Sequence, residues 1–190
     1  MTAVEGDFSR GDVIAVRDSV IYSKFGTRDS IHARLRGGEL LGAWPVPRSR
    51  RRGVSRDAIM YALDRKNWDD PKFTKRYWAN EEFSQDIRLA SLSNGWLVLV
   101  TLDATVDGDA LNGVLMMTIL DLDRGRACVD RVIPHAGVAT PLAVVHGDTV
   151  VTLTQELDAA QRIHLVATYF PVMPATCDWV PLEKAPAPVM

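Results

Sequence analysis

Three side chains in the second half of the chain could carry acid–base chemistry: His135, His146 and Asp148. An imidazole exchanges protons near neutral pH, and a neighbouring carboxylate can orient it. His146 and Asp148 flank a glycine in a predicted turn, and loops at one end of a sheet commonly form binding sites. The three residues therefore predict a site for a small molecule or a substrate. No nucleophile-elbow or phosphate-loop motif surrounds them.

Metal binding is not predicted from the remaining histidines and acidic residues. His32 and His164 each follow an isoleucine in a predicted strand, but no HxH or HExxH spacing is present. Asp103, Asp107 and Asp109 resemble part of a calcium loop that lacks the bidentate glutamate at position twelve. We expect sheet and turn residues here, with neither a metal nor a cofactor.

A basic and aromatic segment departs from the composition of the rest of the chain. It combines a run of arginines with later aromatic residues: Arg50, Arg51, Arg52, Trp68, Tyr77 and Trp78. Arginine, tryptophan and tyrosine are enriched in interface hot spots, whereas basic groups with stacking aromatics also suit single-stranded nucleic acid. Interspersed acidic residues dilute the positive charge, so docking of a protein partner is predicted ahead of nucleic-acid binding through residues 48–78.

The overall composition is that of an ordinary globular domain. The 190 residues are 47% hydrophobic and 24% charged, and a net charge of −2 favours neither nucleic acid nor a membrane surface as partner. The first residues are acidic where a signal peptide is basic, and no apolar run approaches the roughly 20 residues of a membrane helix. We expect a cytoplasmic protein without membrane contact.

The two cysteines open the last strands of two predicted repeats. Equivalent positions on neighbouring sheets usually lie too far apart for a bridge, because the Cα atoms must come within about 7 Å. Cys128 and Cys177 are therefore predicted to be reduced thiols, which agrees with a cytoplasmic location.

The elements that would position these residues form three similar groups of strands. Residues 13–47, 89–134 and 142–181 each read as four short antiparallel strands that end at a proline. Turn signals such as Asn94-Gly95 separate the strands. The central strands WLVLVTL, VLMMTIL and HLVATYF are apolar on both faces, which predicts sheets stacked on both sides.

Residues 48–86 break this pattern and are predicted to be an insertion within a single all-β domain that spans residues 1–190. The stretch SRDAIMYALDRK favours a helix, because Ser55 can cap it while Ile59 and Leu63 share one side. The fold class is therefore mainly β with a partly helical insertion, although the insertion could also be a degenerate fourth repeat.

The four-strand units, two of which end near Trp44-Pro45 and Trp179-Val180-Pro181, resemble the blades of β-propellers. The resemblance covers residues 13–47 and 89–181 and implies sheets stacked face to face. Three blades do not close a ring of four to eight. Residues 48–86, a second copy or another chain could supply the missing blades, or the units could form a layered sandwich or open barrel.

Uncovered sheet edges give the best indication of function. Because bare edge strands aggregate, they must be covered, and a partner can cover them. The sequence predicts a non-catalytic interaction module within a homo- or hetero-oligomeric assembly. The alternatives are a small-molecule-binding protein or enzyme with a site near His135 and His146, and a nucleic-acid-binding accessory protein that uses residues 48–78.

Overall fold

The protein is built almost entirely of antiparallel strands. The computed structural model describes residues 12–25, 29–52, 84–107, 110–133 and 142–186. Within these ranges the one helical element is the short 3-10 turn η3 (Pro174–Thr176), and no helix there is long and apolar enough to cross a membrane. The mainly β fold class is confirmed, whereas the helix predicted to begin at Ser55 lies outside the described residues.

The first sheet contains the four strands predicted for residues 13–47. They lie in the order in which they occur in the chain: β1 (Val13–Arg17), β2 (Val20–Lys24), β3 (Ser30–Leu35) and β4 (Leu40–Pro45). Two of its turns need left-handed backbone, at Asp18 with φ of 55° and at Gly38 with φ of 94°. Asp and Gly are residue types that adopt this conformation readily, so the sequence suits these turns.

The second sheet contains the next predicted group of strands and one unexpected addition. Its members are β5 (Gln85–Ser91), β6 (Leu97–Asp107), β7 (Ala110–Asp121), β8 (Arg126–Ile133) and β12 (Trp179–Pro181), in the order β12-β8-β7-β6-β5. The Asn94-Gly95 hairpin forms as predicted, with φ of 84° at Gly95 and the Trp96 amide donating to Asn94 Oδ1 at 3.0 Å. Strand β5 begins two residues inside the range predicted as an insertion.

The third sheet has three strands rather than the four predicted. It consists of β9 (Leu142–His146), β10 (Thr149–Leu157) and β11 (Ile163–Pro171), in the order β11-β10-β9. The strand that was expected to follow β11 is β12, which instead pairs with β8 of the second sheet. Four sequential strands therefore pair side by side in the first two units but not in the third, and the resemblance to propeller blades is not confirmed.

The position of β12 also explains why the prediction of reduced cysteines is wrong. Cys128 and Cys177 form a disulfide, with their Cα atoms 5.5 Å apart. Because Trp179 pairs with Cys128 in register, the chain just before β12 lies beside β8 rather than on a neighbouring sheet. The two cysteines were placed at equivalent positions of separate sheets, and the argument for a cytoplasmic location that rested on free thiols falls with that placement.

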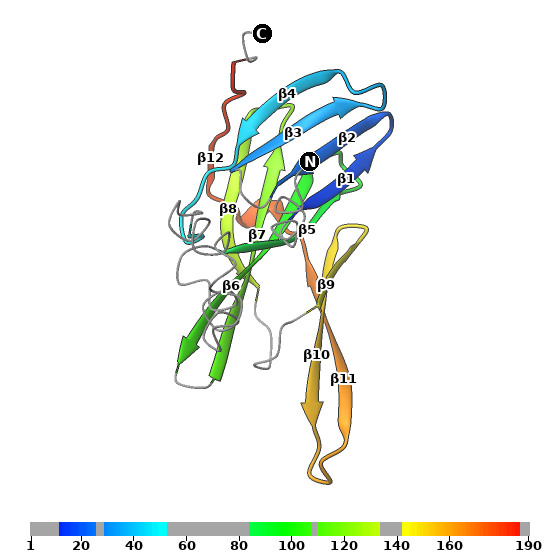
Figure 1. The fold of residues 1–190 in the computed structure, drawn as a ribbon, viewed down its shortest axis with the longest axis vertical. Coiled ribbons are helices and arrows are strands. Elements are labelled where there is room, and N and C mark those ends of the chain that lie inside the picture. The colour runs from blue at the N-terminus through cyan, green and yellow to red at the C-terminus, as the bar shows by residue number, and fades with distance from the viewer. Residues whose placement is uncertain (1–11, 26–28, 53–83, 108–109, 134–141, 187–190) are drawn as a thin grey trace, which may run out of the picture.

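The second sheet is the middle layer, since both of its faces are buried. Leu97 and Leu99 pack with the first sheet around Ile31, whereas Val98 and Val100 pack on the opposite face near Val150 of β10. Figure 1 shows the first sheet above this layer and the β10–β11 hairpin projecting below it. The prediction of sheets stacked on both sides is thus confirmed for β6 and β7.

The residues that follow β12 hold the first two sheets together. Leu182 is buried in the first core cluster, and its amide donates to Gly125 O at 2.8 Å. Ala185 then donates its amide to Ala43 O of β4 at 2.7 Å. The segment therefore covers part of the outer edge of β4 after β12 has covered part of β8.

Candidate functional site

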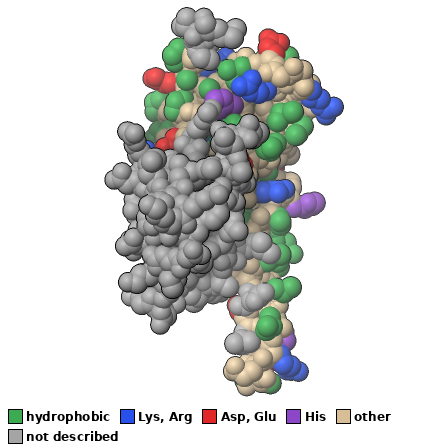
Figure 2. All heavy atoms as spheres, in the orientation of Figure 1, with side chains coloured by type: hydrophobic (Ala, Val, Ile, Leu, Met, Phe, Trp, Pro, Cys, Tyr) green, Lys and Arg blue, Asp and Glu red, His purple; other side chains and the backbone are tan. Residues whose placement is uncertain are grey.

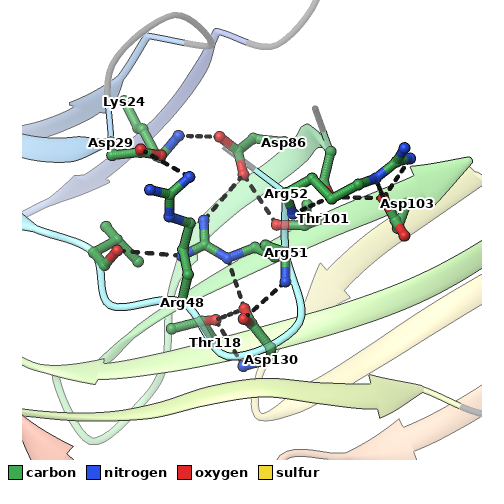
Figure 3. A network of polar contacts seen from close by, with 12 residues as sticks. Lys24, Asp29, Arg48, Arg51, Arg52, Asp86, Thr101, Asp103, Thr118 and Asp130 are labelled. Carbon is green, nitrogen blue, oxygen red and sulfur yellow. Dashed lines mark hydrogen bonds and ion pairs between the residues drawn. The ribbon is translucent and has the colours of Figure 1, made fainter. Parts of the chain in front are cut away.

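Four buried charged side chains form a network between the first two sheets (Figure 3). Lys24 of β2 pairs with Asp86 of β5, and Arg51, in the connection after β4, lies between Asp86 and Asp130 of β8. Arg51 Nε donates to Asp130 Oδ1 at 2.6 Å, and its NH2 group donates to Pro47 O at 2.7 Å. Two cations and two carboxylates balance, which is the condition under which buried charges are tolerated.

Asp130 accepts an unusual number of hydrogen bonds. Its Oδ2 atom takes the backbone amides of Ser49, Arg50 and Arg51 at 2.5–3.1 Å, and Thr118 Oγ1 lies 3.2 Å from its Oδ1. Burial raises the pKa of Asp130, but the amides of Ser49 and Arg50 and the charge of Arg51 together hold that pKa below 3.8. The carboxylate is therefore ionised at neutral pH and fixes the path of the arginine run.

A second group of polar contacts joins Arg52 to Ser84. The Ser84 amide donates to Arg52 O at 3.1 Å, and the Arg52 amide donates to Ser84 Oγ at 2.9 Å. Asp103 of β6 accepts from Arg52 Nε at 2.9 Å and from Ser84 Oγ at 2.7 Å. Arg52 and Ser84, the described residues on either side of residues 53–83, are thus held side by side.

The network is suited to holding elements together rather than to chemistry. Thr101 donates to Asp86 at 2.9 Å, so both carboxylates accept hydrogen bonds from more than one element. Among the described residues no group of three or more histidine, cysteine or acidic residues could hold a metal ion. Sequence reasoning missed the network, yet Lys24 shares the inward row of β2 with buried Tyr22, and a charge on a buried row was the available signal.

The residues predicted to bind a partner differ in how far the structure exposes them. The Arg51 side chain is only 3% exposed and Arg52 is paired with Asp103, whereas the Arg50 side chain is exposed. Trp68, Tyr77 and Trp78 lie outside the described residues. The docking role of this segment stays a prediction, in which Arg50 is the arginine of the three that lies open to a partner.

The predicted small-molecule site is described in part. His146 and Asp148 are exposed on either side of the β9–β10 turn, and His135 lies outside the described residues. Asp148 accepts hydrogen bonds from the Ser93 hydroxyl and, at 2.8 Å, from the Ser93 amide, so it joins this turn to the β5–β6 turn. These bonds, the hydroxyl first, lower the pKa of the Asp148 carboxyl. The convergence of the three residues stays a prediction.

The far end of the β10–β11 hairpin carries a small exposed polar cluster. Asp158 accepts from the amides of Ala160 and Arg162, from Arg162 Nε at 2.8 Å, and lies 2.9 Å from His164 Nε2. The bond to His164, followed by the Arg162 amide, lowers the pKa of Asp158 to about 2. The cluster closes the hairpin, and His164 is thereby engaged at its own turn.

The most unusual surface is the row of β11 side chains that we call the outer row: Ile163, Leu165, Ala167, Tyr169 and Pro171. Ile163, Leu165 and Tyr169 are 66%, 69% and 67% exposed. The alternate residues of β11 are less exposed, and Phe170 packs on the second core cluster. Figure 2 shows hydrophobic side chains along this projecting hairpin, with a basic side chain at its tip. The prediction that both faces of HLVATYF are covered is therefore wrong for the described part of the chain.

Comparisons of the chain with protein-family models, with curated proteins and with solved structures give no match.

Proposed function

We propose that the chain is a non-catalytic interaction module that acts within a homo- or hetero-oligomeric assembly and docks through the outer row of β11. The single observation that supports this proposal is the exposure of Ile163, Leu165 and Tyr169 on one strand. Scattered apolar residues are ordinary on protein surfaces, but a contiguous apolar patch is typical of an interaction site.

The engagement of the titratable groups supports the non-catalytic part of the proposal. Asp130 inside the network, Asp148 and Asp158 each accept hydrogen bonds that lower their pKa. A general base works best with a pKa close to the working pH, so these carboxylates are poorly suited to that role.

The disulfide favours a cellular compartment other than the cytoplasm that the sequence predicts. Disulfides persist in oxidising compartments and are rare where thiol reductants are abundant. We infer that the assembly works in an oxidising compartment. Alkylation of free thiols in the native cells, before any reductant is added, should leave Cys128 and Cys177 unmodified, and full modification would contradict this inference.

The interaction role is tested by measuring the mass of the complex. The chain is obtained both from its own cells and as a purified protein, and light scattering after size exclusion gives its mass against the 21.0 kDa of one chain. A heavier complex in either sample that Leu165→Lys returns to monomer supports the role. Ile14→Lys is the matched control, because Ile14 is 62% exposed on another edge strand, β1. A 21.0 kDa species in both samples, unchanged by Leu165→Lys, would overturn the role.

A further inference from the structure

The sheet edges of the protein differ in how they are covered. Strands β1 and β9 each contact β5, so the edges of β1 and of β9 both lie against β5. The edge strand β4 receives the Ala185 amide, and β12 is only three residues long. Natural proteins manage edge strands by such coverage or by short length. Strand β11 has nine residues and, within the described part of the chain, pairs only with β10.

The open edge of β11 follows from the departure of β12. In a four-stranded unit the last strand would lie beside β11 and cover the flanks of its side chains. Here the chain leaves at Pro171, and the Cys128–Cys177 disulfide together with the β8 pairing holds β12 on the second sheet. Among the described residues none occupies the position of a fourth strand beside β11, so a strand from another molecule can pair there.

The side chains of β11 indicate which kind of strand fits. Residues 163–171 contain no Asp, Glu, Lys or Arg, although charges are a common protection of an edge. Across the sheet, Tyr169 pairs with Val151 and Ala167 with Leu153, so the apolar surface continues onto β10. An uncharged edge of this kind favours an uncharged strand, because a charged partner strand would lose water without gaining an opposite charge.

A second copy of β11 meets these requirements. We propose that two copies of the chain pair through their β11 strands, antiparallel and about a twofold axis at Ala167. In that register Leu165 of one copy lies opposite Tyr169 of the other, and Ile163 lies opposite Pro171. Each apolar residue of the outer row then meets an apolar residue, which gives the self-complementarity that a twofold interface needs.

The length of the paired segment determines how stable a dimer we expect. Nine residues at about 3.4 Å each extend over roughly 30 Å, and the pair of three-stranded sheets becomes one continuous six-stranded sheet. The area of a single strand pair is below the roughly 1,200 Å² of stable protein interfaces, so the dimer is reversible and depends on concentration.

The twofold axis gives a direct test, because Ala167 lies opposite itself. Ala167 is exposed, so a charge there leaves the monomer intact but places two like charges together in the dimer. The purified, oxidised chain is measured by sedimentation velocity over a thousandfold range of concentration. We expect a monomer–dimer equilibrium, at least tenfold weaker for Ala167→Lys and for Ala167→Glu, and restored when these two variants are mixed. Ile14→Lys should behave as the unmodified chain.

Three results would overturn the pairing: a monomer at every concentration, a dimer that neither Ala167 variant weakens, or loss of the dimer in both variants without recovery on mixing. The inference rests on the proposed function, and the two can fail separately. The purified chain could be monomeric while the complex from the native cells is still lost in the Leu165→Lys variant. In that case the twofold pairing is rejected and the interaction role stands.

Discussion

Replacement of Arg51 by methionine should destabilise the protein strongly, because it unbalances the buried network. The Arg51 side chain is 3% exposed and bonds Asp130 Oδ1 at 2.6 Å and Pro47 O at 2.7 Å. Without it, Lys24, which pairs with Asp86 alone, is the one cation left in the four-residue network, and Pro47 O loses its donor. Removal of one partner from a buried ion pair costs about 3–5 kcal/mol. For a chain of this size that is a fall in melting temperature of roughly 6–20 °C.

The neighbouring arginine provides the control for this experiment. Arg50→Met makes the same change one residue earlier, where the side chain is exposed and the amide that bonds Asp130 at 2.8 Å is retained. Its free energy of unfolding should change by less than about 0.5 kcal/mol. Urea unfolding of the oxidised proteins, followed by tryptophan fluorescence, measures both variants. The reasoning is refuted if Arg51→Met lies within about 1 kcal/mol of Arg50→Met.

Three further outcomes are expected. Reduction of Cys128–Cys177, 49 residues apart, should lower the free energy of unfolding in urea by about 4 kcal/mol, and an unchanged midpoint would contradict the bond. Asp158 has a pKa of about 2, below the roughly 3.9 of an unfolded aspartate, so its contribution is present above pH 4 and is lost as the pH falls to 2. Melting curves of Asp158→Asn should therefore show a smaller loss of stability across that window, and an equal loss would contradict the assignment. Thr152 Oγ1 is buried and finds no partner among the described residues, so Thr152→Val should stabilise the protein by up to about 1 kcal/mol in urea, whereas destabilisation would show that the hydroxyl is satisfied.

The strands and turns could be predicted because their determinants are local. The Asn94-Gly95 turn needs a residue that accepts positive φ at Gly95. The alternation or continuity of apolar residues along a strand then determines whether one or both of its faces are buried. In the middle sheet a continuous apolar run buries both faces, since the neighbours Leu97 and Val98 belong to two different core clusters.

The pairing of β12 could not be predicted, because β12 could pair with the edge of either β11 or β8 and local sequence does not distinguish the two. The sequence around Trp179 suits a short strand beside either β11 or β8. The contacts that favour β8 are tertiary: Arg126 lies 4.2 Å from the Trp179 ring, and Trp96 packs edge-on against that ring at 5.3 Å. The disulfide and the open edge of β11 both follow from this one choice, so both were missed together.

The buried network was missed for a related reason. Lys24, Asp86 and Asp130 come from three strands far apart in sequence, and no spacing links them. A run of arginines suggests a surface position for Arg51, yet the backbone amides of Ser49, Arg50 and Arg51 converge on Asp130 and place Arg51 inside.

The late position of β12 in the chain has a consequence for biosynthesis. A nascent polypeptide that has exposed only its first two sheets still lacks Leu182 in the core between them, the strand beside β8 and the thiol that Cys128 requires. Completion of these sheets must therefore wait until translation has passed Ala185, which donates to β4. During that interval the unpaired edges of β4 and β8 are open to other chains, and this is when the protein depends most on chaperones and on an oxidant for its cysteines.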